Sequence, residues 1–189
     1  MSTETNDSEQ PPFVLGAVGG IAAWIIGYAL TFLVAGSDVQ DSPVQRFIEA
    51  VQGEPATYEM VGWVFYNLHF VDTVFTGVPA IGEFTTNAVG GEDGFSTVLY
   101  LIPVGLLLAA GLAVAQYQNV DSTTDGLFAG LTVVPGYLLL SIVGVFLFEV
   151  TLAGATGSPE LLEAIFLAGI VYPAAFGGAG GVLAAVLPE

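Results

Sequence analysis

Four long apolar runs constrain this chain more than any other feature of its sequence. They lie at about 13–35, 96–117, 126–152 and 160–187. A helix needs about 20 apolar residues to cross the hydrocarbon core of a bilayer, and each run is long enough. Lipid offers the backbone no hydrogen-bonding partners, so spanning runs of this kind form helices. The sequence therefore predicts an all-α fold, an integral membrane four-helix bundle, with residues 13–189 as a single membrane domain.

The composition agrees with a membrane protein. Of the 189 residues, 54% are hydrophobic and only 10% are charged, whereas a soluble domain carries about 25% charged residues. Residues 1–12 are polar and acidic and end in two prolines, so we expect a disordered tail there. The tail lacks the basic start of a secretory signal, so the first apolar run is expected to stay as an anchor.

The charge is strongly one-sided, with 18 Asp and Glu residues against a single arginine, Arg46, and no lysine. Acidic loops without lysine are typical of proteins from cells that hold molar salt in the cytoplasm. At about 1 M salt the Debye length is about 3 Å, so the carboxylates repel one another weakly and act mainly as hydration sites. We therefore interpret the charge as a halophilic adaptation. We expect no nucleic-acid partner, because such binding requires Lys and Arg to neutralise phosphates.

Residue types that the chain lacks exclude several kinds of chemistry. Without cysteine there is no disulfide, no Cys metal site and no thiol nucleophile. Without lysine there is no phosphate-binding Gly-Lys loop and no attachment point for retinal. One histidine cannot supply the pair of ligands that a b-type haem needs. We therefore expect no enzyme activity and no cofactor.

Glycines in the first and last spans predict close helix packing. Gly16, Gly20 and Gly27 lie near one helical face, and Gly16-x-x-x-Gly20 is a small-residue pair of the kind that lets membrane helices approach closely. Gly177 and Gly181 belong to a glycine-rich run in the last span, which favours tight packing or a flexible segment. An incidental match is the alternative, since glycine is common in membrane helices.

The loop between the first and second spans, about 36–95, is long enough to carry structure of its own. Asp41-Ser42-Pro43 is a helix start, and the apolar spacing after it predicts a short amphipathic helix over 43–52. A second amphipathic helix is predicted over 58–76, lying at the membrane surface or over the mouth of the bundle, where Trp and Tyr are favoured. An alternating strand pattern fits that stretch less well.

The second, third and fourth spans each contain one proline: Pro103, Pro135 and Pro173. Proline removes a helical hydrogen bond and usually kinks a membrane helix, and transporters use such breaks at binding sites. The alternative is that proline is simply more frequent in membrane helices than in soluble ones. Glu149, near the end of the third run, is either a proton- or cation-binding carboxylate facing the bundle or an ordinary interfacial residue, if the helix stops near Phe148.

The only histidine, His69, lies within the second predicted loop helix. On that helix Asp72 and Glu59 share its face, while Asn67 breaks the pattern. A histidine with two carboxylates could hold a metal ion, and a histidine beside a carboxylate could sense pH. The third interpretation is a structural histidine whose ring nitrogens bond loop carbonyls or carboxylates. With one histidine and no cysteine we predict no metal site, and we take these four residues and Glu149 as functional candidates.

The string Phe65-Tyr66-Asn67-Leu68-His69-Phe70-Val71 carries a family resemblance. With this string, four spans and a long first loop, the chain resembles a family of small uncharacterised haloarchaeal membrane proteins that share Phe-Tyr-Asn-x-His-Phe-Val after the first span. The x position is Leu68 here. The resemblance implies a halophilic archaeal membrane protein and brings no activity with it.

The function predicted from these features is that of a structural or accessory integral membrane protein, assembling with itself or with a larger membrane complex and without catalytic activity. The alternative is a small channel or transporter for ions or small solutes that uses the Pro-kinked helices and Glu149. We expect a multi-pass protein of the cell membrane with both termini in the cytoplasm and loop 36–95 outside. The positive-inside rule gives little guidance, because Arg46 is alone in a long loop.

Overall fold

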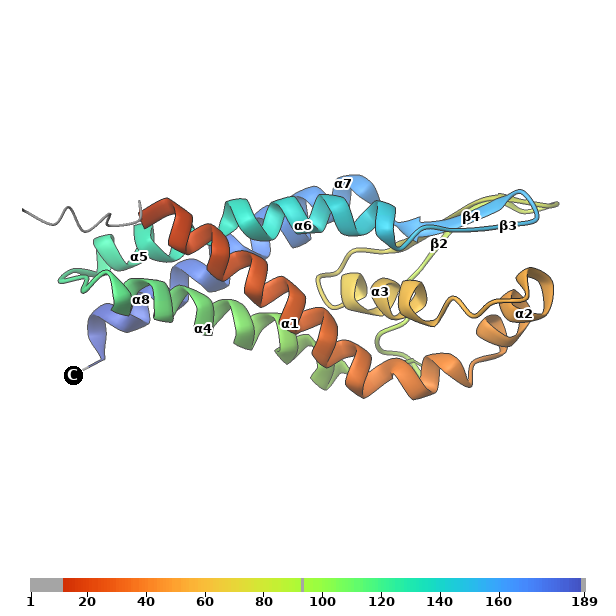
Figure 1. Cartoon of the computed structure of the whole chain (residues 1–189), viewed down its shortest axis with the longest axis horizontal. Helices are drawn as coiled ribbons and strands as arrows, with labels where there is room; N and C mark the ends of the chain where they lie inside the picture. Colours follow the sequence, from red (N-terminus) through yellow and green to blue (C-terminus); the bar gives the residue numbers. More distant parts are fainter. Residues whose placement is uncertain (1–11, 93, 188–189) are drawn as a thin grey trace, which may run out of the picture.

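The computed structural model describes residues 12–92 and 94–187. Within them, four helical segments are long and apolar enough to cross a membrane: Phe13–Gln40, Thr97–Tyr117, Thr123–Leu147 and Leu161–Val186. They form a bundle in which both ends of the described chain lie at one end, and further elements from two loops gather at the other (Figure 1). The predicted tail lies outside the described residues, apart from Pro12, with which the first helix begins.

Two of the four spans are single helical runs and two are interrupted. The first is α1 (Pro12–Gln40), and the second is the 3-10 turn η1 (Thr97–Tyr100) with α4 (Leu101–Tyr117). The third consists of α5 (Thr123–Leu131) and α6 (Val134–Leu147). The fourth consists of α7 (Leu161–Glu163), the two π-helical segments η2 (Ala164–Val171) and η3 (Pro173–Gly177), and α8 (Gly178–Val186).

Two of the three span prolines coincide with these interruptions. Pro135 is the second residue of α6, directly after the break. Pro173 begins η3, where a wider π turn accommodates the missing N–H. Pro103 lies in the first turn of α4, where its missing N–H costs little. The position of each proline within its helix therefore decides whether it breaks the span.

The glycines that were predicted to allow close helix packing all lie where two segments of the chain come close together. A Cβ added at Gly16 or Gly20 of α1 would overlap atoms of the third span at its break, and one at Gly27 would come within 2.9 Å of the Phe65 ring. In the fourth span, a Cβ at Gly181 would overlap the carbonyl oxygen of Gly126. One at Gly177 would lie 2.5 Å from the side chain of Val133. All five glycines thus lie at contacts within one molecule.

The fold is mostly helical but not all-α, because a four-stranded antiparallel sheet forms at the loop end of the bundle. Its order is β2-β1-β4-β3. One hairpin is β1 (Thr73–Val78) with β2 (Gly82–Thr86), and the other is β3 (Val150–Leu152) with β4 (Ala155–Pro159). The hairpins join through β1 and β4, paired from Thr73↔Pro159 to Thr76↔Thr156. The prediction of an all-α fold is wrong at this end.

Strand-forming residues explain the sheet. The β1 sequence, TVFTGV, is rich in β-branched and aromatic side chains, which pack well on a pleated surface. Between β3 and β4, Ala153 and Gly154 both have positive φ, 51° and 90°, as a two-residue hairpin turn requires. Residues 150–152, predicted as the end of the third span, therefore belong to β3, and α6 ends at Leu147.

Of the two predicted loop helices, the first forms over the predicted residues. It is α2 (Pro43–Gln52), which starts at Ser42, whose hydroxyl accepts a hydrogen bond from the Gln45 N–H, and ends at Gly53 in the left-handed conformation. The second, predicted over 58–76, is wrong in extent and setting. It is α3 (Thr57–Asn67), and every residue from Met60 to Asn67 is buried. From Met60 onward the helix lies inside the structure and has no water-facing side, and only its first turn, with Tyr58, is exposed.

Candidate functional site

Buried hydrogen bonds join α3 to α6, which runs in the opposite direction. The indole N–H of Trp63 donates to the carbonyl oxygen of Phe148 at 2.7 Å. One turn further along α3, the hydroxyl of Tyr66 donates to the carbonyl oxygen of Ser141. A buried polar atom needs such a partner, and here two side chains of α3 provide bonds to the backbone of α6 and of the residue that follows it. The bonds hold α3 at one place and in one orientation beside the third span.

His69 follows α3 and continues the same series of contacts. Its side chain is 1% exposed. Nδ1 lies 2.9 Å from the carbonyl oxygen of Phe65. A carbonyl oxygen can only accept, so Nδ1 carries the proton and donates it. Nε2 is then unprotonated and accepts from the hydroxyl of Tyr137 at 2.6 Å. Burial lowers the pKa of His69 to about 4, outweighing the backbone hydrogen bond, which raises it.

Aromatic rings enclose the imidazole of His69. The rings of Phe65, Tyr137 and Tyr172 have centroids 4.9, 5.7 and 4.9 Å from it. Tyr137 and Tyr172 lie near the middle of the third and fourth spans. His69 therefore lies inside the bundle with both ring nitrogens bonded. One of the two partners is a backbone carbonyl, as the structural interpretation expects, and the other is a tyrosine hydroxyl, which that interpretation did not include.

Asn67 closes the tight loop that follows α3. Its Nδ2 donates to the carbonyl oxygen of Val71 at 2.7 Å, and its Oδ1 accepts from the N–H of Ala88 at 2.8 Å. In the loop between Asn67 and Val71, Phe70 has a φ of 58°, an unusual conformation for an aromatic residue. Its ring is exposed and stacks on Tyr100 at 4.7 Å. Asn67 thus stabilises a strained loop and ties it to the segment that precedes η1.

Asp72 and Glu59 do not join His69. The Asp72 carboxylate accepts from Nδ2 of Asn87 at 3.1 Å, and its backbone N–H donates to Glu163 at 2.7 Å. Glu59 lies in the first turn of α3, at the other end of that helix from His69. Across residues 12–92 and 94–187, no group of three or more His, Cys, Asp and Glu side chains could hold a metal ion.

Glu149 lies in the short connection between α6 and β3, and its side chain is exposed. Because α6 ends two residues earlier, the carboxylate lies beyond the helix. This is the position expected for an interfacial residue, and it does not bring the carboxylate into the bundle.

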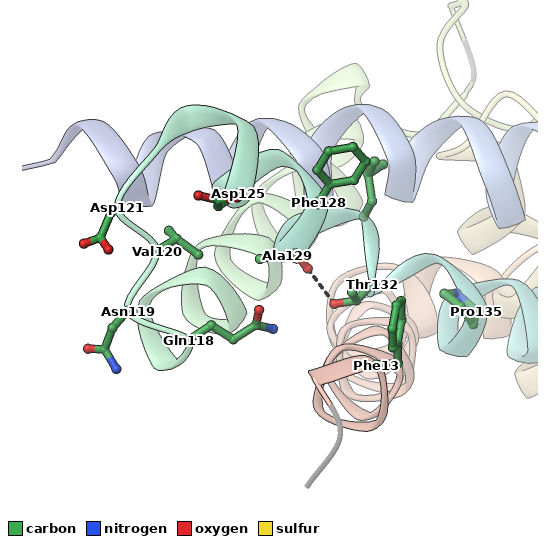
Figure 2. A pocket seen from close by; sticks show the side chains of 11 residues that line it. Phe13, Gln118, Asn119, Val120, Asp121, Asp125, Phe128, Ala129, Thr132 and Pro135 are labelled. Carbon is green, nitrogen blue, oxygen red and sulfur yellow. Dashed lines mark hydrogen bonds between the residues drawn. The ribbon is translucent and has the colours of Figure 1, made fainter. Parts of the chain in front are cut away.

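A cavity of about 630 Å³ opens beside the break in the third span, as Figure 2 shows. Phe13, Phe128 and Pro135 contribute apolar surface to it. The polar surface comes from residues of the turn between α4 and α5 and from the first turn of α5: Gln118, Asn119, Asp121 and Asp125. Thr132, at the break, donates its hydroxyl to the carbonyl oxygen of Ala129. The cavity therefore has one apolar side and one acidic side.

A groove of about 490 Å³ runs between α1 and α4 and is almost wholly apolar. Small residues dominate its lining: Gly19, Ala22 and Ala23 from α1, and Ala109, Ala110 and Ala113 from α4. Larger side chains such as Val18, Ile26 and Tyr117 line the rest, and all three are exposed. The backbones of two neighbouring helices thus lie close to the surface of the bundle, covered only by small side chains.

A second apolar groove, of about 420 Å³, lies between α2 and the sheet. Val44, Phe47 and Val51 of α2 contribute to one wall, and all three are half exposed or more. Ile48 of α2, Trp63 of α3 and residues of the strands and their turns complete the lining. At one end Gln52 Nε2 donates to the carbonyl oxygen of Thr151 at 2.6 Å, linking α2 to β3.

Tyr137 and the two grooves are absent from the candidates that the sequence suggested. A tyrosine hydroxyl in the middle of an apolar run needs a buried partner, and this need is the one available clue to the contact with His69. The grooves depend on which helices and strands pack side by side, so no local pattern reveals them.

A family model described as "Family of unknown function (DUF7978)" matches residues 1–188. The comparisons with curated proteins and with solved structures give no match. A family of unknown function that covers nearly the whole chain agrees with the expected uncharacterised family.

Proposed function

The chain belongs to the DUF7978 family of unknown function, and we propose that it is an accessory or structural membrane protein that assembles with a second copy of itself. The contact would be the groove between α1 and α4. The observation that carries this proposal is the lining of that groove by small residues on two adjacent spans.

Small residues favour helix association in lipid for a physical reason. Lipid tails are as apolar as leucine, so helices associate there through close van der Waals packing rather than through the hydrophobic effect. Glycine and alanine let two backbones approach closely enough for that packing. Gly19, Ala22 and Ala113 provide such a surface, and Ala22 and Ala113 are exposed.

The groove is distinct from the small-residue contacts inside the molecule. On α1, Gly16, Gly20 and Gly27 are in contact with the third span and α3. A Cβ added at Gly19 would meet only side chains at ordinary contact distance, the nearest being that of Val114 at 3.4 Å. The helix thus presents two small-residue faces, one of which is occupied and one of which opens outward. A two-fold dimer, the commonest closed assembly, would use the outward face of both copies.

The rest of the molecule suits such a role. Hydrogen bonds that Trp63 and Tyr66 donate to backbone carbonyls, and one that Tyr137 donates to His69, hold α3 rigidly against α6 and leave the middle of the bundle packed with aromatic rings. A rigid bundle presents its outer face in one shape, which lowers the entropy cost of association. These features support assembly without requiring a reaction.

The charge supports a further part of the proposal, a halophilic and archaeal origin. With 18 acidic residues and one arginine, the protein would be most stable in molar salt, where repulsion is screened. Equal unfolding midpoints in molar and in dilute potassium chloride would contradict this part.

The proposed orientation, with α2 and the sheet outside the cell, would be contradicted by protease cleavage of that region only after lysis.

Filling the groove is expected to weaken self-association. In Ala22→Leu the added side chain occupies the space that a facing backbone would need. We expect the dissociation constant of the dimer in detergent or lipid to rise about tenfold or more, equivalent to about 1.4 kcal/mol. Energy transfer between donor- and acceptor-labelled copies, measured as a function of protein-to-lipid ratio, reports this constant.

Ala175→Leu is the matched control, because Ala175 is exposed on the fourth span and does not line the groove. It should leave the dissociation constant unchanged. A wild-type protein that shows no energy transfer at any protein-to-lipid ratio would contradict the proposal, as would equal effects of the two substitutions. Co-purification of a different membrane protein that is lost only in Ala22→Leu would replace the second copy by that partner.

One observation favours transport as a second candidate. The third span is broken between α5 and α6, and the break faces the cavity that carries Asp121 and Asp125 (Figure 2). Broken helices beside polar groups are found at the binding sites of transporters. Glu149 gives this candidate no support, because it lies outside the helix. The absence of cation or solute flux into liposomes containing the wild-type protein would contradict it.

A further inference from the structure

We propose that the groove between α2 and the sheet binds the hydrocarbon chain of a bilayer lipid. This groove is separate from the α1–α4 groove, and the proposal does not depend on self-assembly. It rests on what the lining can and cannot satisfy chemically.

The lining of the groove offers almost no polar group. Thr156 is the one polar residue among the lining residues, and its hydroxyl already has a partner, the hydroxyl of Thr151 at 3.1 Å. Trp63 belongs to the lining, but its N–H is donated to Phe148. The indole therefore presents only its ring to the groove. A molecule that entered would meet carbon atoms and no free donor or acceptor side chain.

This lining selects against most classes of ligand. A sugar, a nucleotide or an extended peptide would bring N–H, O–H and C=O groups into a place where they find no partner. Burying one unsatisfied polar group costs about 1–3 kcal/mol judged from mutations in proteins. A hydrocarbon chain brings no such group, and it would cover Val44, Phe47 and Val51, which are otherwise exposed to solvent.

The size of the groove narrows the choice further. Its 420 Å³ lies within the range of about 300–1,000 Å³ that is typical of small-molecule sites. A helix with its side chains is about 10–12 Å across, so a partner helix could insert only a few side chains. An extended hydrocarbon chain is narrow enough to enter whole.

The surrounding charges indicate a chain that belongs to a lipid rather than a free fatty acid. No lining residue is cationic. Glu49 is exposed on α2, and Arg46 on the same helix lies 3.6 Å from the Asp41 carboxylate. A free carboxylate would therefore gain no partner and would be repelled, whereas a lipid keeps its headgroup outside the groove.

The groove is also next to surface that resembles the lipid-facing part of the bundle. Phe146 and Leu147 end α6 and are exposed, at 65% and 59%. Only Phe148 and the exposed Glu149 separate them from β3, whose Val150 and Leu152 line the groove. The apolar end of the third span therefore lies within a few residues of the groove, and the bilayer itself can supply the hydrocarbon chain.

Quenching of Trp63 fluorescence by brominated lipid tests this inference. Trp24 and Trp63 are the only tryptophans, so Trp24→Phe leaves Trp63 as the single reporter; Trp24→Tyr is the substitute if that variant does not fold. The protein is reconstituted into phosphatidylcholine vesicles whose acyl chains carry bromine, and into the same vesicles without bromine. We expect Trp63 to lose fluorescence in the brominated vesicles and to resist quenching by aqueous acrylamide.

A matched pair of variants separates the groove from general proximity to the bilayer. Ala155→Phe places a ring in the groove from β4 and should restore the fluorescence, whereas Ala50→Phe, on α2 but not among the lining residues, should not. Full fluorescence of Trp63 in brominated vesicles would overturn the proposal. Quenching of Trp63 by acrylamide would also overturn it, because it indicates water in the groove. So would protection of Trp63 from both bromine and acrylamide that disappears when the protein is diluted into excess lipid, because it indicates a protein partner.

Discussion

Gly181→Val is expected to destabilise the bundle at the end where α1 begins and α8 ends, by about 3 kcal/mol or more. A Cβ at Gly181 would overlap the carbonyl oxygen of Gly126, and a Cβ at Gly126 would overlap that of Gly181. The contact is backbone against backbone, so no side chain can rotate out of the way. Overpacking a core usually costs about 1–3 kcal/mol and occasionally more, and this contact belongs at the upper end.

The measurement is the unfolding free energy in detergent micelles titrated with a denaturing detergent. Ala179→Val is the matched control, because Ala179 is on the same helix and exposed. It should leave the midpoint nearly unchanged. If both variants unfold at the same midpoint as the wild type, the close contact between α5 and α8 does not exist in the form described.

Acidification is expected to remove about 3 kcal/mol of stability through His69 alone. Burial holds the pKa of His69 at about 4 in the folded protein, compared with an ordinary value of 6.5. Between these two values the unfolded chain binds more protons than the folded one, so stability falls as the pH decreases. The contribution is complete above pH 6.5 and is lost progressively down to about pH 4, at about 1.4 kcal/mol for each pH unit between the two pKa values.

Carboxylates titrate in part of the same window, so the effect is measured as a difference between two proteins. His69→Gln has no titrating ring, and its unfolding free energy should therefore change less between pH 7 and pH 4.5 than that of the wild type. Parallel curves for the two proteins would show that His69 titrates normally. That result would contradict the enclosed, hydrogen-bonded position between Phe65 and Tyr137.

The four long apolar helices could be predicted because the requirement that an apolar run in a bilayer be helical is local. A charge-free run such as the one from Phe13 must form a helix by itself, whatever its neighbours are. The same holds for α2, where Ser42, Pro43 and the apolar spacing lie within a dozen residues. Both elements are specified by side chains close together in the sequence, so they can be recognised without knowing the fold.

The sheet and the setting of α3 could not be recognised in this way. β1 pairs with β4, and Thr73 and its partner Pro159 are separated in sequence by the second and third spans. Projecting the α3 sequence on a helix predicts a water-facing side only if the helix is assumed to lie at a surface. In the structure, Phe65 is enclosed by aromatic residues of α1 and lies beside Tyr66. Neither the strand that pairs with β1 nor the helix that packs against α3 can be recognised from the local sequence pattern.

The candidate site shows the same division. His69 was recognisable because it is the only histidine, but its partner Tyr137 lies in the third span, and the bond between them depends on how α3 packs against α6. Asn67 was recognisable as a polar residue in an apolar stretch, and it bonds Val71 and Ala88. Glu149 attracted attention only because the third run was extended past Leu147, where the hydrophobicity continues into a strand.

Disulfide cross-linking in the native membrane tests the proposed assembly most directly, because the chain has no cysteine of its own. A disulfide forms only where two Cα atoms come within about 7 Å. With Ala22→Cys we expect a covalent dimer under mild oxidation, and with Ala175→Cys, on the fourth span, we expect monomer. Monomer from both Ala22→Cys and Ala113→Cys, or equal dimer from Ala175→Cys, would contradict assembly through the groove between α1 and α4.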